Sequence, residues 1–269
     1  MPQFGESYGA GWCQCPRKGS ISAVSRYGST QVSFGPGPIG KAVRALLIAN
    51  GAIWVVTLFS PDLITELFGL TPAAVVTRGY VWQVATYMFL HDPDNISHIL
   101  FNMLMLWMFG VDLERRWGTR GFVKYYAITG IGAGLCTLLV SLLPIAAVQR
   151  MYVLPTVGAS GAIFGLLLAW GLLFPTRTIL FMFVFPLPAR TFVAIMAAIE
   201  LYTVATRPGG PIAAVAHLGG MLIGWLYLKG PTNLRLELNY RLTKWRMERM
   251  RKKFDVHKGG RDQWGNRLH

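Results

Sequence analysis

Long apolar runs, separated by short polar segments, fill the middle of the chain. A helix that crosses a bilayer needs roughly 20 apolar residues, within a range of about 17 to 25. The sequence therefore predicts six spans, at about 42–60, 97–112, 121–143, 158–174, 189–206 and 212–229. The second, fourth and sixth are short, which favours helices that begin below the membrane surface and line a wet cavity.

The segments outside these runs have their own character. Residues 177–188 form an apolar run that two prolines interrupt, and we expect a loop in the membrane interface. Residues 1–41 are rich in Gly and Ser without an apolar core, which predicts a flexible tail and no cleavable signal peptide. In the basic tail 231–269, three leucines and Trp245 follow one helical stripe. The stripe predicts an amphipathic helix on anionic inner-leaflet lipids, or alternatively a solvated, partly disordered tail. Residues 42–230 remain as the six-helix domain.

Composition strengthens the membrane interpretation. The 269 residues are 53% hydrophobic and 14% charged, whereas a soluble domain has about a quarter charged residues. We therefore expect an all-α polytopic membrane protein. The net charge of +14 could suggest nucleic acid, but nearly half of the basic residues follow Leu228 and no nucleic-acid-binding motif accompanies them. The pair Cys13 and Cys15 lacks the spacing of a zinc or redox motif, so we expect no role for it or for Cys136.

The basic residues also predict an orientation. With both termini in the cytoplasm, every Lys and Arg except Arg78, Arg150 and Arg207 lies on the inner side of the membrane. The positive-inside rule therefore favours that orientation, and an even number of spans agrees with it.

Four polar residues then fall at one shallow depth on the outer side. Ser160 begins the fourth span, His217 lies one to two turns into the sixth, and His98 and Asn102 share one face of the second at i, i+4 spacing. Taken singly, Ser160 is typical of a small residue that packs between helices, and His217 could bridge two helices. His98 and Asn102 could cap a helix. Together they favour an active site, since a serine beside an imidazole is an activatable nucleophile.

Small residues flank both the serine and the histidine. The ridges consist of Gly158, Gly161 and Gly165 in the fourth span and of Ala216, Gly220 and Gly224 in the sixth. Such ridges let helix backbones approach closely in lipid. We therefore expect the fourth span to pack against the sixth.

The order of these motifs resembles that of rhomboid intramembrane serine proteases, of the bacterial six-span type. Residues 158–165, Gly-Ala-Ser-Gly-Ala-Ile-Phe-Gly, match the GxSG segment, and 216–224 match the AHxxGxxxG helix. His98 and Asn102 match the HxxxN motif. Residues 82–91 and 110–118 resemble the first outer loop and the following inner loop, so the resemblance covers about 42–229.

The resemblance implies a Ser160–His217 dyad without an acid, and we see no Asp or Glu at a matching depth near His217. It implies that the Asn102 amide, the Ser160 backbone N–H and His98 hold the oxyanion, and that Phe164 packs on the histidine. The supporting residues are Gly158, Gly161, Phe164, Gly220 and Gly224. Neither a metal nor a cofactor is implied.

The resemblance further implies endoproteolysis of single-span membrane proteins near the outer part of their helix. A lateral gate beside the fifth span and a mobile cap at 207–211 belong to the same expectation. We expect a cell inner membrane, with both termini cytoplasmic and the active site open to the outer side.

Alternatives remain for some residues and for the function. His91, Asp92, Asp94 and His98 could suggest a metal cluster, although Pro93 and the spacing favour loop-structuring roles. Glu200 lies within two turns of the outer end of the fifth span, from which it can reach the interface. The rival functions are a catalytically inactive relative that binds clients and a small transporter or channel. The sequence has neither an HExxH zinc motif nor buried aspartates in its spans, which sets aside the other intramembrane proteases.

Overall fold

The computed structural model describes residues 37–145, 148–181, 185–206 and 212–230, together with Trp245, Met247 and Arg249. The predicted N-terminal tail, most of the predicted amphipathic C-terminal helix and the predicted cap at 207–211 lie outside the described residues.

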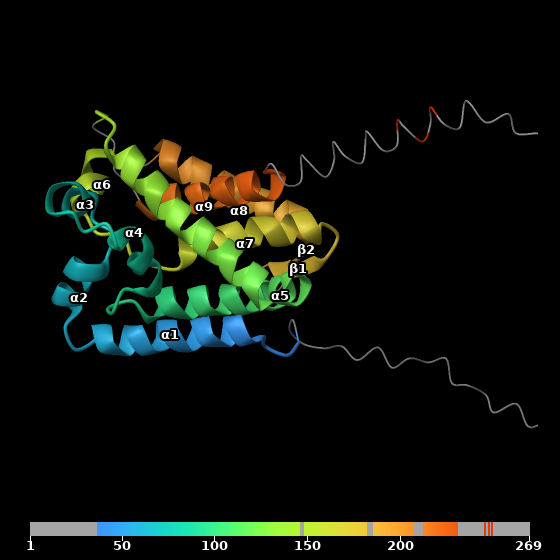
Figure 1. Ribbon diagram of the computed structural model, residues 1–269, viewed down its shortest axis with the longest axis horizontal. Helices are drawn as coiled ribbons and strands as arrows, with labels where there is room; N and C mark the ends of the chain where they lie inside the picture. Colours follow the sequence, from blue (N-terminus) through green and yellow to red (C-terminus); the bar gives the residue numbers. More distant parts are fainter. Residues whose placement is uncertain are drawn as a thin grey trace, which may run out of the picture. The chain divides into compact units, whose positions relative to one another are not determined.

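Helices make up most of the described chain (Figure 1). The longer ones are α1 (Lys41–Thr57), α5 (Ile96–Ser141), α7 (Ser160–Leu173), α8 (Ala189–Thr206) and α9 (Ile212–Lys229). Shorter helices are α2 (Pro61–Phe68), α3 (Pro72–Arg78), α4 (Gln83–Thr86), the 3₁₀ helix η1 (Tyr87–Phe89) and α6 (Gln149–Val153). By length and composition α5, α8 and α9 can cross a membrane, and α7 is a shorter apolar helix. Helices occupy all six predicted positions, while the count of six spans stays a prediction.

The expected inner loop between the second and third spans is a sharp bend inside α5. Only Gly118 has non-helical angles there, with φ 73° and ψ 164°, so the helical halves run over 96–117 and 119–141. Glycine tolerates this left-handed φ without the clash that a Cβ would cause. Just before the bend, the Glu114 carboxylate accepts hydrogen bonds from the backbone N–H groups of Ala42 (2.9 Å) and Val43 (3.0 Å). Glu114, four residues before the bend, therefore fixes the start of α1.

Two other segments differ from the prediction. The expected interfacial loop at 177–188 is an antiparallel hairpin of β1 (Thr178–Phe181) and β2 (Phe185–Pro188), so the fold is not purely α-helical. Proline is tolerated at a sheet edge, and a two-stranded hairpin consists of edge strands. The segment between the first two predicted spans also contains helices: α2 and α3 precede the expected outer loop at 82–91, and α4 lies within it. Buried Gln83 holds them together, because its Oε1 accepts from the Thr71 N–H (3.0 Å) and its Nε2 donates to the Glu66 carbonyl (2.7 Å).

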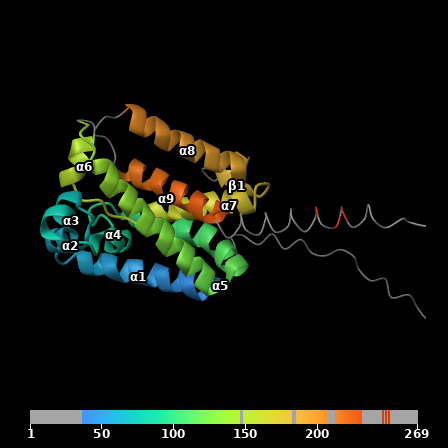
Figure 2. The same ribbon diagram turned by 45° about the horizontal axis from the view of Figure 1, so that its top comes forward.

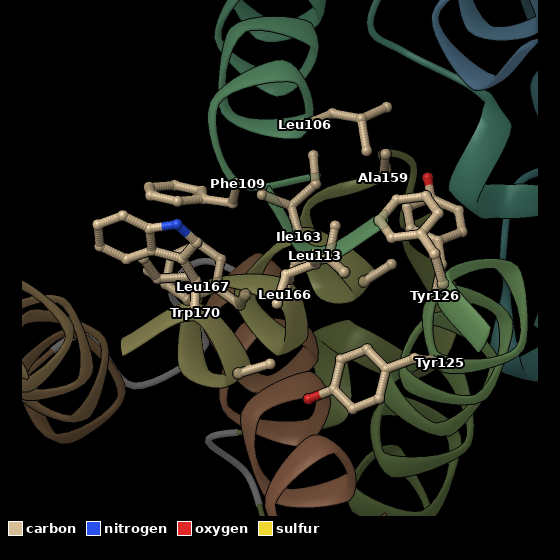
Figure 3. Packing of buried hydrophobic residues seen from close by; sticks show 14 of the residues in the cluster. Leu106, Phe109, Leu113, Tyr125, Tyr126, Ala159, Ile163, Leu166, Leu167 and Trp170 are labelled. Carbon is tan, nitrogen blue, oxygen red and sulfur yellow. The ribbon is translucent and has the colours of Figure 1, made fainter. Parts of the chain in front are cut away.

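The core lies where α5, α7 and α9 pack together. Figure 3 shows the side chains of α5 and α7 interdigitated there, with the ring of Phe109 beside the indole of Trp170; the ring centroids are 5.3 Å apart. The buried hydroxyl of Tyr125 donates to the Gly165 carbonyl at 2.9 Å. Aromatic packing thus joins the first half of α5 to α7, and the hydroxyl of Tyr125 joins the second half to the same helix.

Helix α8 packs differently from the other long helices. Its buried residues, Ala189, Phe192 and Val193, all lie in the first turns. Figure 2 shows α8 running beside α9 at the margin of the bundle. The second half of α8 therefore presents most of its surface outward.

Candidate active site

The α7–α9 crossing is built on glycine. A Cβ at Gly220 would lie 1.9 Å from the carbonyl oxygen of Gly161, a separation that no side chain permits. The two backbones therefore touch, as the small-residue ridges predict. The crossing brings Ser160 Oγ to 2.7 Å from His217 Nε2.

Ser160 is the first residue of α7, and the turn before it is fixed. Gly158 has φ +125°, a conformation open to glycine, and its N–H donates to the Tyr87 carbonyl at 3.0 Å. Further back, Thr156 pairs with Leu70 through two backbone hydrogen bonds. The first N–H groups of a helix have no partner inside it and carry its positive dipole end. The Ser160 N–H is such a group, so this turn offers a donor beside the hydroxyl.

The imidazole of His217 has a stacking contact on its face in addition to the contact of its Nε2 with Ser160. The ring of Phe164 stacks on it with centroids 4.1 Å apart and planes 5° apart. Phe164 is one turn after Ser160 on α7, so one helix supplies both the nucleophile candidate and the stacking ring. This stacking fixes the plane of the imidazole, while the contacts of its two nitrogens determine which edge faces Ser160.

The expectation that no carboxylate lies beside His217 is wrong. Glu200 Oε1 on α8 lies 3.0 Å from His217 Nδ1, and the side chains are 13% and 14% exposed. Glu200 points into the bundle instead of reaching for the interface. The sequence could have indicated this contact. Glu200 precedes the end of α8 by six residues, and His217 follows the start of α9 by five. At 1.5 Å per residue, the two residues lie about 9 and 8 Å along their helices from the adjoining helix ends.

His98 and Asn102 lie near the serine, as their spacing predicts. The Asp92 backbone N–H donates to His98 Nδ1 at 3.3 Å, so a neutral His98 carries its proton on Nε2. That Nε2 lies 2.8 Å from where a Cβ of Gly158 would stand, so it faces the turn before Ser160. Asn102 Nδ2 donates to the His98 carbonyl of its own helix at 2.7 Å, which leaves a second amide proton.

A cavity of about 470 Å³ joins these groups. Ser160, His217, His98 and Asn102 all line it. The rest of its wall is mainly apolar and includes Phe101, Met105, Ile163, Phe164, Met196 and Ala213. A nucleophile candidate, a candidate base and three potential oxyanion donors therefore meet at one apolar cavity. Glu200 contacts the candidate base from outside the lining of that cavity, and the whole arrangement is suited to acyl transfer.

The loop before α5 shows structural contacts. Asp92 Oδ1 accepts from the Asp94 N–H at 3.0 Å, and the rings of His91 and His98 meet edge to face with centroids 5.2 Å apart. Burial and the neighbouring His98 lower the pKa of His91 to about 4. Among the described residues, no three His, Cys, Asp or Glu side chains are placed to hold a metal ion.

Comparison with known proteins adds to this geometry. The family model described as the Rhomboid domain matches residues 78–230, which include every residue of the site. The chain belongs to the rhomboid family.

Several rhomboid relatives are similar to the chain over its helical region. Rhomboid protein 1, mitochondrial, of Saccharomyces cerevisiae is 37% identical over 131 residues, which are 48% of this chain and 36% of that protein. Rhomboid protease GluP of Bacillus subtilis is 33% identical over 100 residues, or 37% and 17% of the two chains. Rhomboid protease AarA of Providencia stuartii is 33% identical over 105 residues, or 37% of each. The matches thus span less than half the length of each of these relatives.

Proposed function

We propose that this rhomboid is an intramembrane serine endopeptidase in which Ser160 is the nucleophile and His217 the general base. The observation that carries the proposal is the 2.7 Å separation of Ser160 Oγ from His217 Nε2 in the wall of an apolar cavity. A polar pair buried among apolar helices is costly in free energy, and such pairs usually mark a functional site. The names of the two bacterial relatives, both rhomboid proteases, support the same activity.

The reaction follows from the geometry. The Ser160 hydroxyl passes its proton to His217 Nε2 as Oγ attacks a peptide carbonyl, and the imidazolium then protonates the leaving amine. Water hydrolyses the resulting acyl-enzyme by the same route, which regenerates Ser160. Each cycle leaves His217 neutral and consumes one water molecule.

The oxyanion of the tetrahedral intermediate needs donors beside Ser160. The Ser160 N–H, the Nε2–H of His98 and the second amide proton of Asn102 meet this need from two helices. Removing one such donor in other serine proteases lowers kcat by roughly 100- to 1,000-fold. The Asp92 contact, which puts the His98 proton on Nε2, supports this role for His98.

The substrates are single-span membrane proteins. The apolar wall of the cavity suits a segment that enters from the bilayer, and a helix must unwind before its carbonyl reaches Ser160. Gly, Pro and small residues near the cut lower the cost of unwinding, so they favour cleavage. No cofactor is required by this mechanism.

We place the protein in a cell inner membrane, with six spans and both termini in the cytoplasm. The Lys and Arg distribution supports this orientation, in which the site opens to the outer side. Related rhomboids carry mitochondrial and chloroplastic names, so the fold itself is not tied to one membrane.

Purified protein in liposomes tests the proposal with a single-span substrate that carries a small residue at its outer helix end. Wild type should cleave it, Ser160→Ala and His217→Ala should not, and all three should unfold at similar temperatures. Ser141→Ala is the matched control, because the Ser141 hydroxyl donates to Leu138 within α5. Cleavage by Ser160→Ala would contradict the mechanism, and folded wild type that cleaves nothing would favour a client-binding role.

A further inference from the structure

Glu200 is placed where a serine protease would place the acid of a triad. Three helices converge on His217: α9 carries it, α7 presents Ser160 to its Nε2, and α8 presents Glu200 to its Nδ1. The two contacts lie at opposite nitrogens of one ring, with lengths of 2.7 and 3.0 Å. A line of Glu200, His217 and Ser160 thus runs across the bundle at one depth.

The chemistry of the carboxylate fixes the proton on the ring. An ionised carboxylate only accepts hydrogen bonds, so a neutral His217 must carry its proton on Nδ1 to donate to Glu200. Nε2 is then unprotonated and faces the Ser160 hydroxyl as an acceptor. This is the tautomer that a general base requires, and the opposite tautomer would point an N–H at the nucleophile.

We propose that Glu200 is a positioning residue that holds His217 in its active tautomer and orientation and stabilises the imidazolium formed during catalysis. The inference rests on the proposed protease function and deepens it from a Ser160–His217 pair to a triad. Glu200 takes no proton in the reaction. Its charge faces the cation that His217 becomes when the Ser160 proton arrives.

A purely structural role is the competing explanation, since the same contact joins α8 to α9. The C-terminal half of α8 has no buried residue among those described. Loss of the Glu200–His217 contact there would therefore alter helix packing and substrate entry. Such a loss would change KM or thermal stability. Loss of a positioning residue would instead lower kcat.

The test compares Glu200→Gln, Glu200→Ala and Glu200→Asp in the full-length protein in liposomes. We expect kcat to fall at least about tenfold in the Gln and Ala variants with little change in KM, and to recover in part with Asp. The loss should stay below the roughly 10,000-fold seen when triad enzymes lose their acid, because Phe164 also holds the ring. Thr203→Val, one turn further along α8, is the matched control and should behave as wild type.

Wild-type kcat in the Gln and Ala variants, with Ser160→Ala inactive, would overturn the role of Glu200 and leave the proposed protease intact. Wild-type protein that cleaves nothing would instead overturn the proposed protease function. If the variants fail to fold, ¹⁵N NMR of histidine-labelled wild type decides. The resonances that disappear in His217→Ala should show a protonated Nδ1 and an unprotonated Nε2. A protonated Nε2 in neutral His217 would overturn the proposal.

Discussion

Helices α7 and α9 differ from α8 in how they hold their part of the site. The span-length apolar window is 33% buried in α9 but 17% buried in α8. Ser160 and His217 stand on helices whose backbones touch at Gly161 and Gly220. Glu200 stands on the helix with the weaker packing. The nucleophile and base are therefore rigidly placed, while the carboxylate depends on the position of α8.

The two ends of α8 also differ from each other. At the N-terminal end the Ala189 N–H donates to the Arg177 carbonyl at 2.7 Å, and Val193 packs closely against Gly171. In its C-terminal half, Glu200 contacts His217 of α9. Movement of the C-terminal half of α8 would therefore remove the carboxylate from the site before it disturbs Ser160 and His217.

The largest effect on cleavage is expected at the helix crossing. Gly220→Ala places a Cβ against the Gly161 backbone, which cannot rotate away as a side chain would. Overpacking of this kind costs about 1–3 kcal/mol or more, and relief requires the helices to separate. We expect a markedly lower unfolding temperature in detergent and loss of cleavage. Gly51→Ala in α1, where a Cβ meets nothing within 4 Å, is the control and should be at least as stable as wild type. Wild-type stability and cleavage in Gly220→Ala would refute the tight crossing.

Two aromatic truncations compare the core with α8 directly. Phe109 is 1% exposed and Tyr202, in the C-terminal half of α8, is 70% exposed. Lipid is as apolar as the core, so the cost of Phe109→Ala comes from the cavity left among packed helices, about 3–5 kcal/mol. Tyr202→Ala should change the free energy of unfolding by less than about 0.5 kcal/mol. Equal losses in the two variants, measured by unfolding in detergent, would mean that α8 is packed as firmly as the core.

A smaller effect, dependent on pH, is expected from the loop beside His98. The pKa of His91 is lowered to about 4 in the folded protein. Between pH 6.5 and 4, the His91 side chain therefore takes up a proton in the unfolded chain but stays neutral in the folded one. Stability from this residue is therefore complete above pH 6.5 and is lost as the pH falls towards 4, by about 3 kcal/mol. His91→Phe should flatten the pH dependence of unfolding over that window. An unchanged slope in the variant would show that folding does not lower the pKa of His91.

Helix positions and the serine–histidine pair could be predicted from the sequence because apolar runs and glycine ridges are local patterns. The direction of Glu200 could not be predicted so directly, since an acid two turns from a helix end can reach either the interface or a partner. Its depth matched that of His217, but which face of α8 meets α9 depends on tertiary packing. The bend at Gly118 could not be predicted either. A single glycine with a left-handed φ does not distinguish, in the sequence, a bend within a helix from a loop between two helices.

Covalent labelling of wild-type protein with a fluorophosphonate, followed by peptide mass spectrometry, tests the central claim most directly. Such reagents phosphonylate an activated serine and report on the nucleophile without any substrate. The account predicts one adduct, on Ser160, that is lost in His217→Ala while the variant stays folded. An adduct on another serine, or none on folded protein, would contradict the assignment of Ser160 and His217 as nucleophile and base.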